Sequence, residues 1–372
     1  MRRCIARAPR RWQPLALLGA VTALGSALGC SGAPGARGAD PTPRASPVIV
    51  AQQTSGTTAL LQDVSAVNAH VVWVGGHAAT WAVTTDGGRR WRSVVMPNAD
   101  SVEFRDVYAA DDRTAYLLSS GLGERSRIYK TTDGGATWRL QFTAREPKAF
   151  FDCFAFWDAD HGIAVSDEVD GHFLVIGTDD GGATWSRVPA DALPPAQAGE
   201  GAFAASGTCV MTAQPGDAWI GTGNAGRSRV LHTADRGHTW EVETTPLHAA
   251  VGEGITSLAV RDAQHLVALG GPTTHLDAHE DEVAITGDGG RSWTPGGRLP
   301  FSGPVYGAAY APGGSGWLVA VGPRGAAASY DDGRHWALVD TLGYWSVGFG
   351  NARTAWAVGP DGRIARLTLP DR

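Results

Sequence analysis

The sequence predicts an all-β fold, a seven-bladed β-propeller made of four-stranded antiparallel blades. A turn of the form Ser/Thr-x-Asp-x-Gly-x-x-Trp recurs six times, at intervals of about 43 to 55 residues, which suits one blade per turn. A short apolar strand pattern precedes each turn and occurs a seventh time near the C-terminus. Gly is abundant, with 50 among 372 residues, and Trp is high at 14. No segment after residue 30 shows a sustained apolar pattern of helical period, so tight hairpins are favoured over helices.

The repeated turn is expected to join the third and fourth strands of its blade. Asp followed by Gly is favoured where the backbone must enter the left-handed region. The Asp carboxylate and the Ser/Thr hydroxyl can bond to the turn's own backbone, and the Trp can pack against a neighbouring blade. We therefore expect a structural role for these six pairs. They are Asp86 and Trp91, Asp133 and Trp138, Asp180 and Trp185, Asp235 and Trp240, Asp288 and Trp293, and Asp331 and Trp336.

The seventh blade lacks one strand if only the C-terminal residues are counted. Its strand pattern at 355–360 is followed by GRIARLTL (362–369), and then the chain stops. The β-branched segment 47–54 at the other end has no blade of its own. We expect this segment to supply the missing strand, because pairing the two ends closes the ring and removes exposed sheet edges. The propeller would then span residues 48–369.

The N-terminal segment has the features of an export signal. Five arginines precede the apolar run 15–28, which is shorter than the roughly 20 residues of a spanning helix. The run ends in Ala27-Leu28-Gly29-Cys30, which resembles a bacterial lipobox, in which the Cys is lipidated. We expect a lipoprotein signal peptide at 1–29, lipidation at Cys30 and a flexible tether at 30–47. The alternative is an ordinary secretory signal. In either case the expected location is the periplasmic or cell-surface side of a bacterial membrane. With lipidation at Cys30, the lipid anchor would be the membrane contact.

Composition and motifs limit the kinds of ligand. The formal net charge is −6, and removal of residues 1–29 would remove five arginines and no acid. An exported acidic domain is not expected to bind nucleic acid. No Cys/His metal spacing and no Gly-rich phosphate loop occurs, so we expect no metal and no cofactor. The acidic and His-containing stretch 275–282 is interpreted as a solvated insertion rather than a metal site.

Candidate binding residues come from aligning the innermost strands of the blades. Polar residues near the starts of these strands are expected to surround the mouth of the central channel. They are Gln62, Asp63, Arg105, Asp106 and Asp152. The alternative is a set of hydrogen-bonded polar groups around a water-filled hole. The pattern predicts no role for the stretch GEGAFAASGT (199–208).

The same alignment places Cys153 and Cys209 at equivalent positions of neighbouring blades. Equivalent side chains are expected to point the same way around the ring, so these two should not face each other. A disulfide requires converging Cβ atoms, and we therefore disfavour one here, although an oxidising compartment would permit it.

The repeated turn resembles the Asp box of bacterial neuraminidase-type (BNR) repeats. Seven units, the N-terminal lipobox and the TTDGG-x-x-W layout resemble the photosystem II stability/assembly factors of this superfamily. That resemblance implies a non-enzymatic propeller without catalytic residues. It would act as a scaffold for protein partners, including a membrane complex.

The resemblance to sialidases, another branch of the superfamily, implies the alternative function of a glycoside hydrolase or a glycan-binding protein. Sialidases carry a Phe/Tyr-Arg-Ile-Pro motif, and the nearest match here is Phe104-Arg105-Asp106-Val107, which lacks the Pro. They also use a Tyr nucleophile activated by Glu, and no Glu is tied by spacing to Tyr306 or Tyr310. The scaffold function is therefore preferred.

Overall fold

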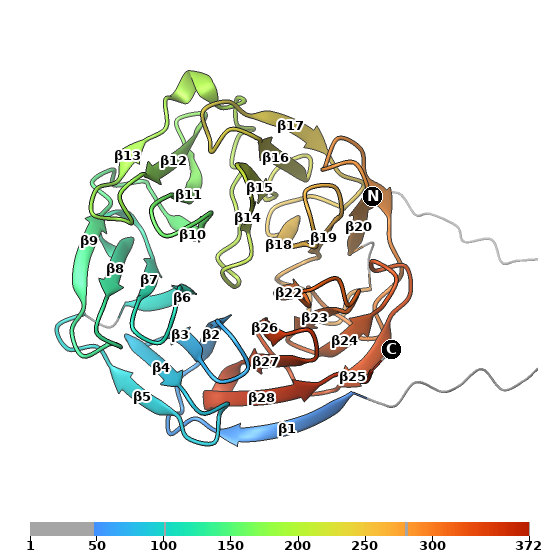
Figure 1. Cartoon of the computed structure of the whole chain (residues 1–372). Helices are drawn as coiled ribbons and strands as arrows, with labels where there is room; N and C mark the ends of the chain where they lie inside the picture. Colours follow the sequence, from blue (N-terminus) through green and yellow to red (C-terminus); the bar gives the residue numbers. More distant parts are fainter. Residues whose placement is uncertain (1–47, 100–101, 280–281, 372) are drawn as a thin grey trace, which may run out of the picture. The chain divides into compact units, whose positions relative to one another are not determined.

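Seven four-stranded antiparallel sheets are arranged around a central axis in the computed structural model, which describes residues 48–99, 102–279 and 282–371 (Figure 1). Each sheet is one blade, and strands follow the chain from the axis outward. The prediction of a seven-bladed propeller is therefore confirmed. No helix in the described part of the chain is both long enough and apolar enough to cross a membrane. The predicted signal peptide (1–29), lipidation site (Cys30) and tether (30–47) lie outside the described residues.

Blade 1 contains β2 (Leu61–Ala66), β3 (Val72–Gly76), β4 (Thr80–Thr84) and β5 (Arg92–Val95). Blade 2 contains β6 (Glu103–Ala109), β7 (Ala115–Ser120), β8 (Arg127–Thr131) and β9 (Arg139–Thr143). Blade 3 contains β10 (Phe151–Phe156), β11 (Gly162–Val169), β12 (His172–Thr178) and β13 (Ser186–Arg187). Blade 4 contains β14 (Val210–Ala213), β15 (Asp217–Gly221), β16 (Arg229–Thr233) and β17 (Glu241–Thr244). Blade 5 contains β18 (Ile255–Val260), β19 (Leu266–Gly270), β20 (Val283–Thr286) and β21 (Thr294–Pro295).

Blade 6 contains β22 (Gly307–Tyr310), β23 (Leu318–Gly322), β24 (Gly325–Ser329) and β25 (Ala337–Asp340). Blade 7 contains β26 (Ser346–Asn351), β27 (Thr354–Val358) and β28 (Arg363–Thr368), with β1 (Ile49–Thr54) outermost. Single 3-10 turns lie at η1 (Gly123–Arg125), η2 (Ala190–Ala192) and η3 (Pro360–Gly362).

The seventh blade is built from both ends of the chain. Strand β1 pairs antiparallel with β28, with Ile49 opposite Thr368 and Thr54 opposite Arg363. The sheet order is β1-β28-β27-β26, so the N-terminal strand takes the outermost position (Figure 1). The expected closure of the ring is confirmed. Val50 on this strand packs against the apolar cluster shared by blades 6 and 7.

The apolar core lies between blades rather than within one. Each of seven buried clusters combines side chains of two adjacent blades. The cluster of blades 3 and 4, for example, joins Val165 and Phe173 to Ile220 and Leu231. Because every blade shares its buried faces with both neighbours, the loss of one interface exposes apolar surface on two blades.

The repeated turns are held by a shared set of hydrogen bonds. In blade 2 the Thr131 hydroxyl donates to Asp133 Oδ1 over 2.8 Å and accepts from the backbone N–H of Gly135 over 2.9 Å. Asp133 Oδ1 also accepts from the backbone N–H of Thr137, and its Oδ2 accepts from the Thr137 hydroxyl. The hydroxyl-to-Asp contact recurs in the other five turns. The pKa of Asp133 is held at about 2, first by the hydrogen bonds of Thr137 and then by that of Thr131.

The Trp residues of the turns pack into the interblade clusters from their rims. Trp240 is buried, at 8% exposure, in the cluster of blades 3 and 4, whereas Trp91, Trp138, Trp185, Trp293 and Trp336 are partly buried. The fully buried indoles come instead from the second and third strands of the blades. They are Trp73, Trp81, Trp219 and Trp356.

Removal of β1 is expected to lower stability sharply, because it exposes the edge of β28 and part of the cluster of blades 6 and 7. We compare a chain of residues 48–372 with one of residues 55–372 by circular dichroism melting. The shorter chain should melt lower by about 10 °C or more. Equal melting temperatures would contradict the role given to this strand pair.

Candidate functional site

Gln62, the first of the residues predicted at the channel mouth, lies at a β-bulge. The pairing of β2 with β3 shifts between Leu61 and Asp63, which leaves Gln62 as the extra residue. The same shift leaves Arg105 on β6 and Asp152 on β10 without a ladder partner. A bulge re-aims the side chain of its extra residue, and bulges are common at the rims of barrels and near binding sites. The same register shift therefore recurs in blades 1, 2 and 3, at the positions of Gln62, Arg105 and Asp152.

The segment between β13 and β14 enters the centre of the ring, where Figure 1 shows the loop that leads into β14. The Ser206 hydroxyl donates to the carbonyl of Tyr306 on the opposite side, over 2.7 Å. Gln62 Nε2 donates to the carbonyl of Ala204 over 2.8 Å. A Cβ at Gly207 would lie 2.2 Å from Asp106 Oδ1, so only Gly fits there. Residues 201–208, which we call the channel plug, therefore occupy the centre of the ring and contact several blades there. The sequence pattern predicted no role for this stretch.

A pocket of about 270 Å³ lies at the mouth of the channel, above the plug. Two of the five predicted mouth residues, Gln62 and Arg105, line it. Tyr306 and Trp345 form one wall, with ring centroids 4.8 Å apart and an interplanar angle of 47°. The other lining residues are Leu60, His77, Phe203, Ala204, Ala205 and Thr273. The mouth pocket thus combines aromatic rings, one guanidinium group and the backbone of the plug.

Arg105 is the fixed positive charge of the mouth pocket. Its Nε and a terminal nitrogen donate to Glu103 Oε2 over 3.0 and 2.6 Å, and its guanidinium lies 5.9 Å from the ring centroid of Phe150. Burial alone raises the pKa of Glu103, but the hydrogen bond and the charge of Arg105 outweigh it, so the pKa lies below its ordinary value. Glu103 therefore stays ionised and holds the guanidinium at the rim.

His77 contacts the same group of residues. Its Nε2 lies 2.5 Å from Gln62 Oε1, and its Nδ1 lies 3.7 Å from Glu103. Burial lowers the pKa of His77, and Glu103 only partly opposes this effect. A neutral ring at pH 7 follows, so the charge of the pocket comes from Arg105.

The predicted mouth residues Asp63 and Asp106 lie beneath the plug and do not line the pocket. Each accepts a hydrogen bond from the backbone of the next blade: Asp63 Oδ2 from Val107, and Asp106 Oδ2 from Phe154. Burial raises the pKa of Asp106 well above its ordinary value, and the charge of Asp63 raises it further. A proton on Asp106 that is donated to Asp63 satisfies both carboxyl groups, so this pair joins blades rather than binding a ligand.

Asp152, the fifth predicted mouth residue, is also buried and faces Asp167. Burial raises its pKa well above the ordinary value, and the charge of Asp167 adds to this effect. Burial likewise raises the pKa of Asp167, and its hydrogen bond with Asp152 lowers the pKa by less, so the pKa is raised to about 6. Asp152 Oδ2 has no other partner in the described structure. A proton shared between the two carboxyl groups explains this arrangement.

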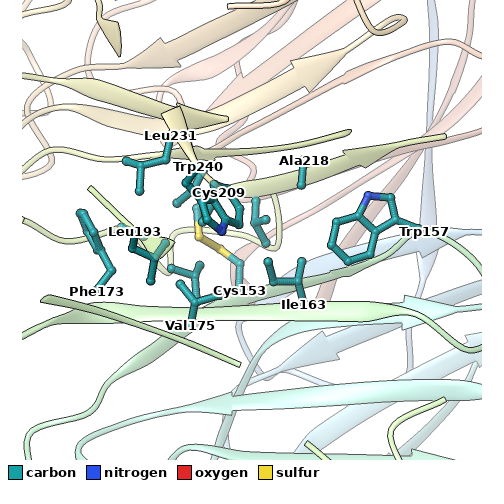
Figure 2. Packing of buried hydrophobic residues seen from close by; sticks show 14 residues of the cluster. Cys153, Trp157, Ile163, Phe173, Val175, Leu193, Cys209, Ala218, Leu231 and Trp240 are labelled. Atoms are coloured by element: carbon teal, nitrogen blue, oxygen red, sulfur yellow. A yellow bond between two sulfur atoms is a disulfide. The ribbon is translucent and has the colours of Figure 1, made fainter. Parts of the chain in front are cut away.

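The expectation that Cys153 and Cys209 do not face each other is wrong. Their Cα atoms lie 6.0 Å apart and the two residues form a disulfide. Figure 2 shows it inside the cluster of blades 3 and 4, beside Leu193 and Trp240. The reason is that Cys209 does not occupy the strand position that the alignment gave it: it precedes β14, which begins at Val210, and ends the segment that crosses the centre of the ring. Its side chain is therefore not bound to the direction of Cys153, which lies within β10.

No group of three or more metal-ligating side chains suited to a metal ion occurs in the described ranges. Of the stretch 275–282, residues 280 and 281 lie outside the description. Asp277 pairs with Arg324 at 2.9 Å on the surface.

No protein-family model matches the sequence, and no curated protein matches it. Solved structures do match. A structure of YCF48 bound to a D1 peptide has a TM-score of 0.62 and 16% identity, covering 89% of this chain and 97% of that chain. YCF48 from Cyanidioschyzon merolae has a TM-score of 0.61 and 14% identity, covering 86% of this chain and 98% of that one. The likeness shows the fold.

A second kind of propeller matches almost as well. The GH74 xyloglucanase from Xanthomonas campestris has a TM-score of 0.60 and 14% identity, covering 86% of this chain and 53% of that chain. The chain is thus similar in fold both to YCF48 and to a glycoside hydrolase, and its function must be argued from its own residues.

Because the carboxyl groups of Asp152 and Asp167 both have raised pKa values, we expect the free energy of unfolding to fall as pH rises. A carboxyl whose folded pKa is raised binds more protons in the native state, so its contribution is present below the unfolded pKa and lost as pH rises through the folded value. For Asp167 this pH window runs from 3.8 to about 6. Across it the free energy of unfolding should fall by on the order of 3 kcal/mol. Asp167→Asn should therefore stabilise the protein more at pH 7.5 than at pH 5, measured by thermal melting.

The exposed Asp170, whose pKa is lowered by Lys148, provides the control. Asp170→Asn should produce no stabilisation that grows with pH. A difference between Asp167→Asn and the parent that stays constant from pH 5 to pH 7.5 would contradict the assignment.

Loss of the disulfide is expected to destabilise the protein by restoring freedom to the unfolded chain. The two cysteines are 56 residues apart, which corresponds to about 4 kcal/mol in the chain-entropy estimate. Urea unfolding of the double variant Cys153→Ala/Cys209→Ala measures this loss. A reducing agent should lower the midpoint of the parent and leave that of the variant unchanged; the same response in both would refute the bond.

Proposed function

We propose that this protein is an exported, lipid-anchored, non-enzymatic propeller that binds a protein partner in its mouth pocket. The observation that carries the proposal is the pocket itself, where Arg105 lies beside the aromatic wall of Tyr306 and Trp345. Aromatic and Arg side chains are the residues most enriched among the energetic centres of protein interfaces. In this function the chain would support the assembly or stability of a membrane complex.

The chemistry of the pocket suits an extended peptide segment. An apolar side chain can fill the space against Tyr306 and Trp345. Arg105 donates from Nε and one terminal nitrogen to Glu103, and its other terminal nitrogen donates a long hydrogen bond of 3.4 Å to the Ala204 carbonyl, which leaves two of its five N–H groups. It therefore keeps donors for a carbonyl or carboxylate of the partner. A fold neighbour, YCF48, has been solved bound to a D1 peptide, which supports a peptide ligand for this chain too.

The residues around the pocket favour binding over catalysis. Glycoside hydrolysis uses two carboxyl groups that flank the scissile bond. The described lining of the mouth pocket contains no carboxylate, and Glu103 beside it is paired with Arg105. Asp63, Asp106 and Asp152 are buried and do not line the pocket. These positions support a non-enzymatic role.

A glycan-acting or glycan-binding protein is the second candidate. Two observations favour it: the fold likeness to a GH74 xyloglucanase and the aromatic wall, on which a sugar ring could stack. This candidate predicts activity or binding with glycans that depends on the same wall.

Export and lipid anchoring rest on the N-terminal sequence. The arginine-rich start, the short apolar run and Cys30 support a lipoprotein signal, and residues 30–47 supply a tether for the propeller. With this anchor the propeller would act at a membrane surface, where a membrane complex is within reach.

The proposal predicts a partner whose capture depends on the mouth pocket. Immobilised propeller is incubated with detergent-solubilised membranes of the source organism, and retained proteins are quantified by mass spectrometry. Arg105→Ala and Trp345→Ala should each reduce the retained partner by roughly tenfold or more. Arg187→Ala, which alters an exposed arginine on β13, is the control and should retain the partner.

Three outcomes would count against the proposal. One is no protein above background, and another is a partner whose capture survives both pocket variants. The third is hydrolysis or binding of sialosides or xyloglucan that disappears in Arg105→Ala, which would favour the glycan function instead.

A further inference from the structure

A second pocket, of about 620 Å³, lies between the outer strands of blades 1 and 2. We call it the outer cleft. Strands β4 and β5 with residues 96–99 form one wall, and β8, the repeated turn of blade 2 and β9 form the other. It shares no described lining residue with the mouth pocket. Its volume is in the range of pockets that hold small molecules.

Blade 1 contributes an additional indole, Trp81, to the outer cleft. In blades 4 to 6 the Trp of the repeated turn donates its N–H to the Gly three residues earlier, over 3.0 to 3.1 Å. In blade 2 the ring of Trp81 occupies the space against Gly135, where a Cβ would lie 2.3 Å from it. Trp138 packs edge-to-face on Trp81, with centroids 5.4 Å apart, and its N–H has no partner in the described structure.

The walls of the outer cleft are largely apolar. Val94 and Met96 line it from blade 1, and Trp138 and Leu140 line it from blade 2. Leu140 is 53% exposed, and Val95 beside the cleft is 63% exposed. Apolar side chains left in water at the edge of a pocket favour a ligand with an apolar body.

Arg92 supplies the polar end of this pocket. Its guanidinium lies 4.6 Å from the ring centroid of Trp81, and one of its nitrogens donates to the carbonyl of Gly134. A guanidinium has five N–H donors, and no ion pair of Arg92 occurs among the described residues. Arg127 also lines the cleft, with its Nε donating to the Glu124 carbonyl. The positive charge on which the polar end of the cleft depends is that of Arg92, which lies among its described lining residues.

We propose that the outer cleft binds a small monocarboxylate with an apolar tail, such as a medium-chain fatty acid. The carboxylate pairs with the guanidinium of Arg92, a planar group that matches carboxylate geometry. The tail lies along Met96, Trp138 and Leu140. This site is separate from the mouth pocket, so its ligand neither replaces nor requires the protein partner proposed above.

Isothermal titration calorimetry with decanoate tests the site on the purified full-length chain. The parent should bind decanoate with one-to-one stoichiometry, and Arg92→Gln should bind it roughly tenfold or more weaker. Arg139→Gln is the matched control, because Arg139 holds the equivalent position after the Trp of the next turn but does not line the cleft. Melting curves verify that each variant is folded.

A second variant and three further probes separate the charge from the tail. Leu140→Asp keeps Arg92 but places a negative charge where the tail should lie, and it should also weaken decanoate binding. Decanol and decyltrimethylammonium lack the anion and should bind weakly, as should butyrate, which lacks the tail. The proposal is overturned if decanoate does not bind, if decanol or decyltrimethylammonium binds as tightly, or if Arg92→Gln binds like the parent.

Discussion

The pairing of β1 with β28 is the constraint on which the rest of the structure depends. Each buried cluster is shared by two blades, so no blade has a complete core of its own. A row of such units ends in two half-covered blades unless its ends meet. The β1–β28 ladder fixes blade 7 from both chain termini and thereby allows blades 6 and 7 to bury their shared cluster. The stability of the ring is therefore a property of the whole circle rather than a sum of independent blades.

The fold could be predicted from the sequence because its determinants are local and repeated. The Ser/Thr–Asp–Gly contacts span a few residues, so each turn has its own signature in the chain. Six signatures and seven strand patterns then define the number of blades. Closure of the ring could also be predicted, because the N-terminal segment 47–54 had no blade of its own and the seventh blade lacked one strand.

The site was predicted only in part, because it depends on how the blades converge at the axis. Alignment located Gln62 and Arg105 in the correct region, since a bulge recurs at their position. It could not show that the plug would cover Asp63 and Asp106, because residues 201–208 belong to no repeat. Nor could it show that the segment before β14 would bring Cys209 within bonding distance of Cys153. His77 carries no sequence signal beyond its place at the end of a strand pattern.

The plug has a consequence for transport through the ring. Its contacts extend from Gln62 in blade 1 to Tyr306 in blade 6, and Cys209 at its end is bonded to blade 3. A polypeptide tail that enters beside the aromatic wall of Tyr306 and Trp345 therefore meets the backbone of the plug, which lines the same pocket, and its path along the axis is obstructed at that depth.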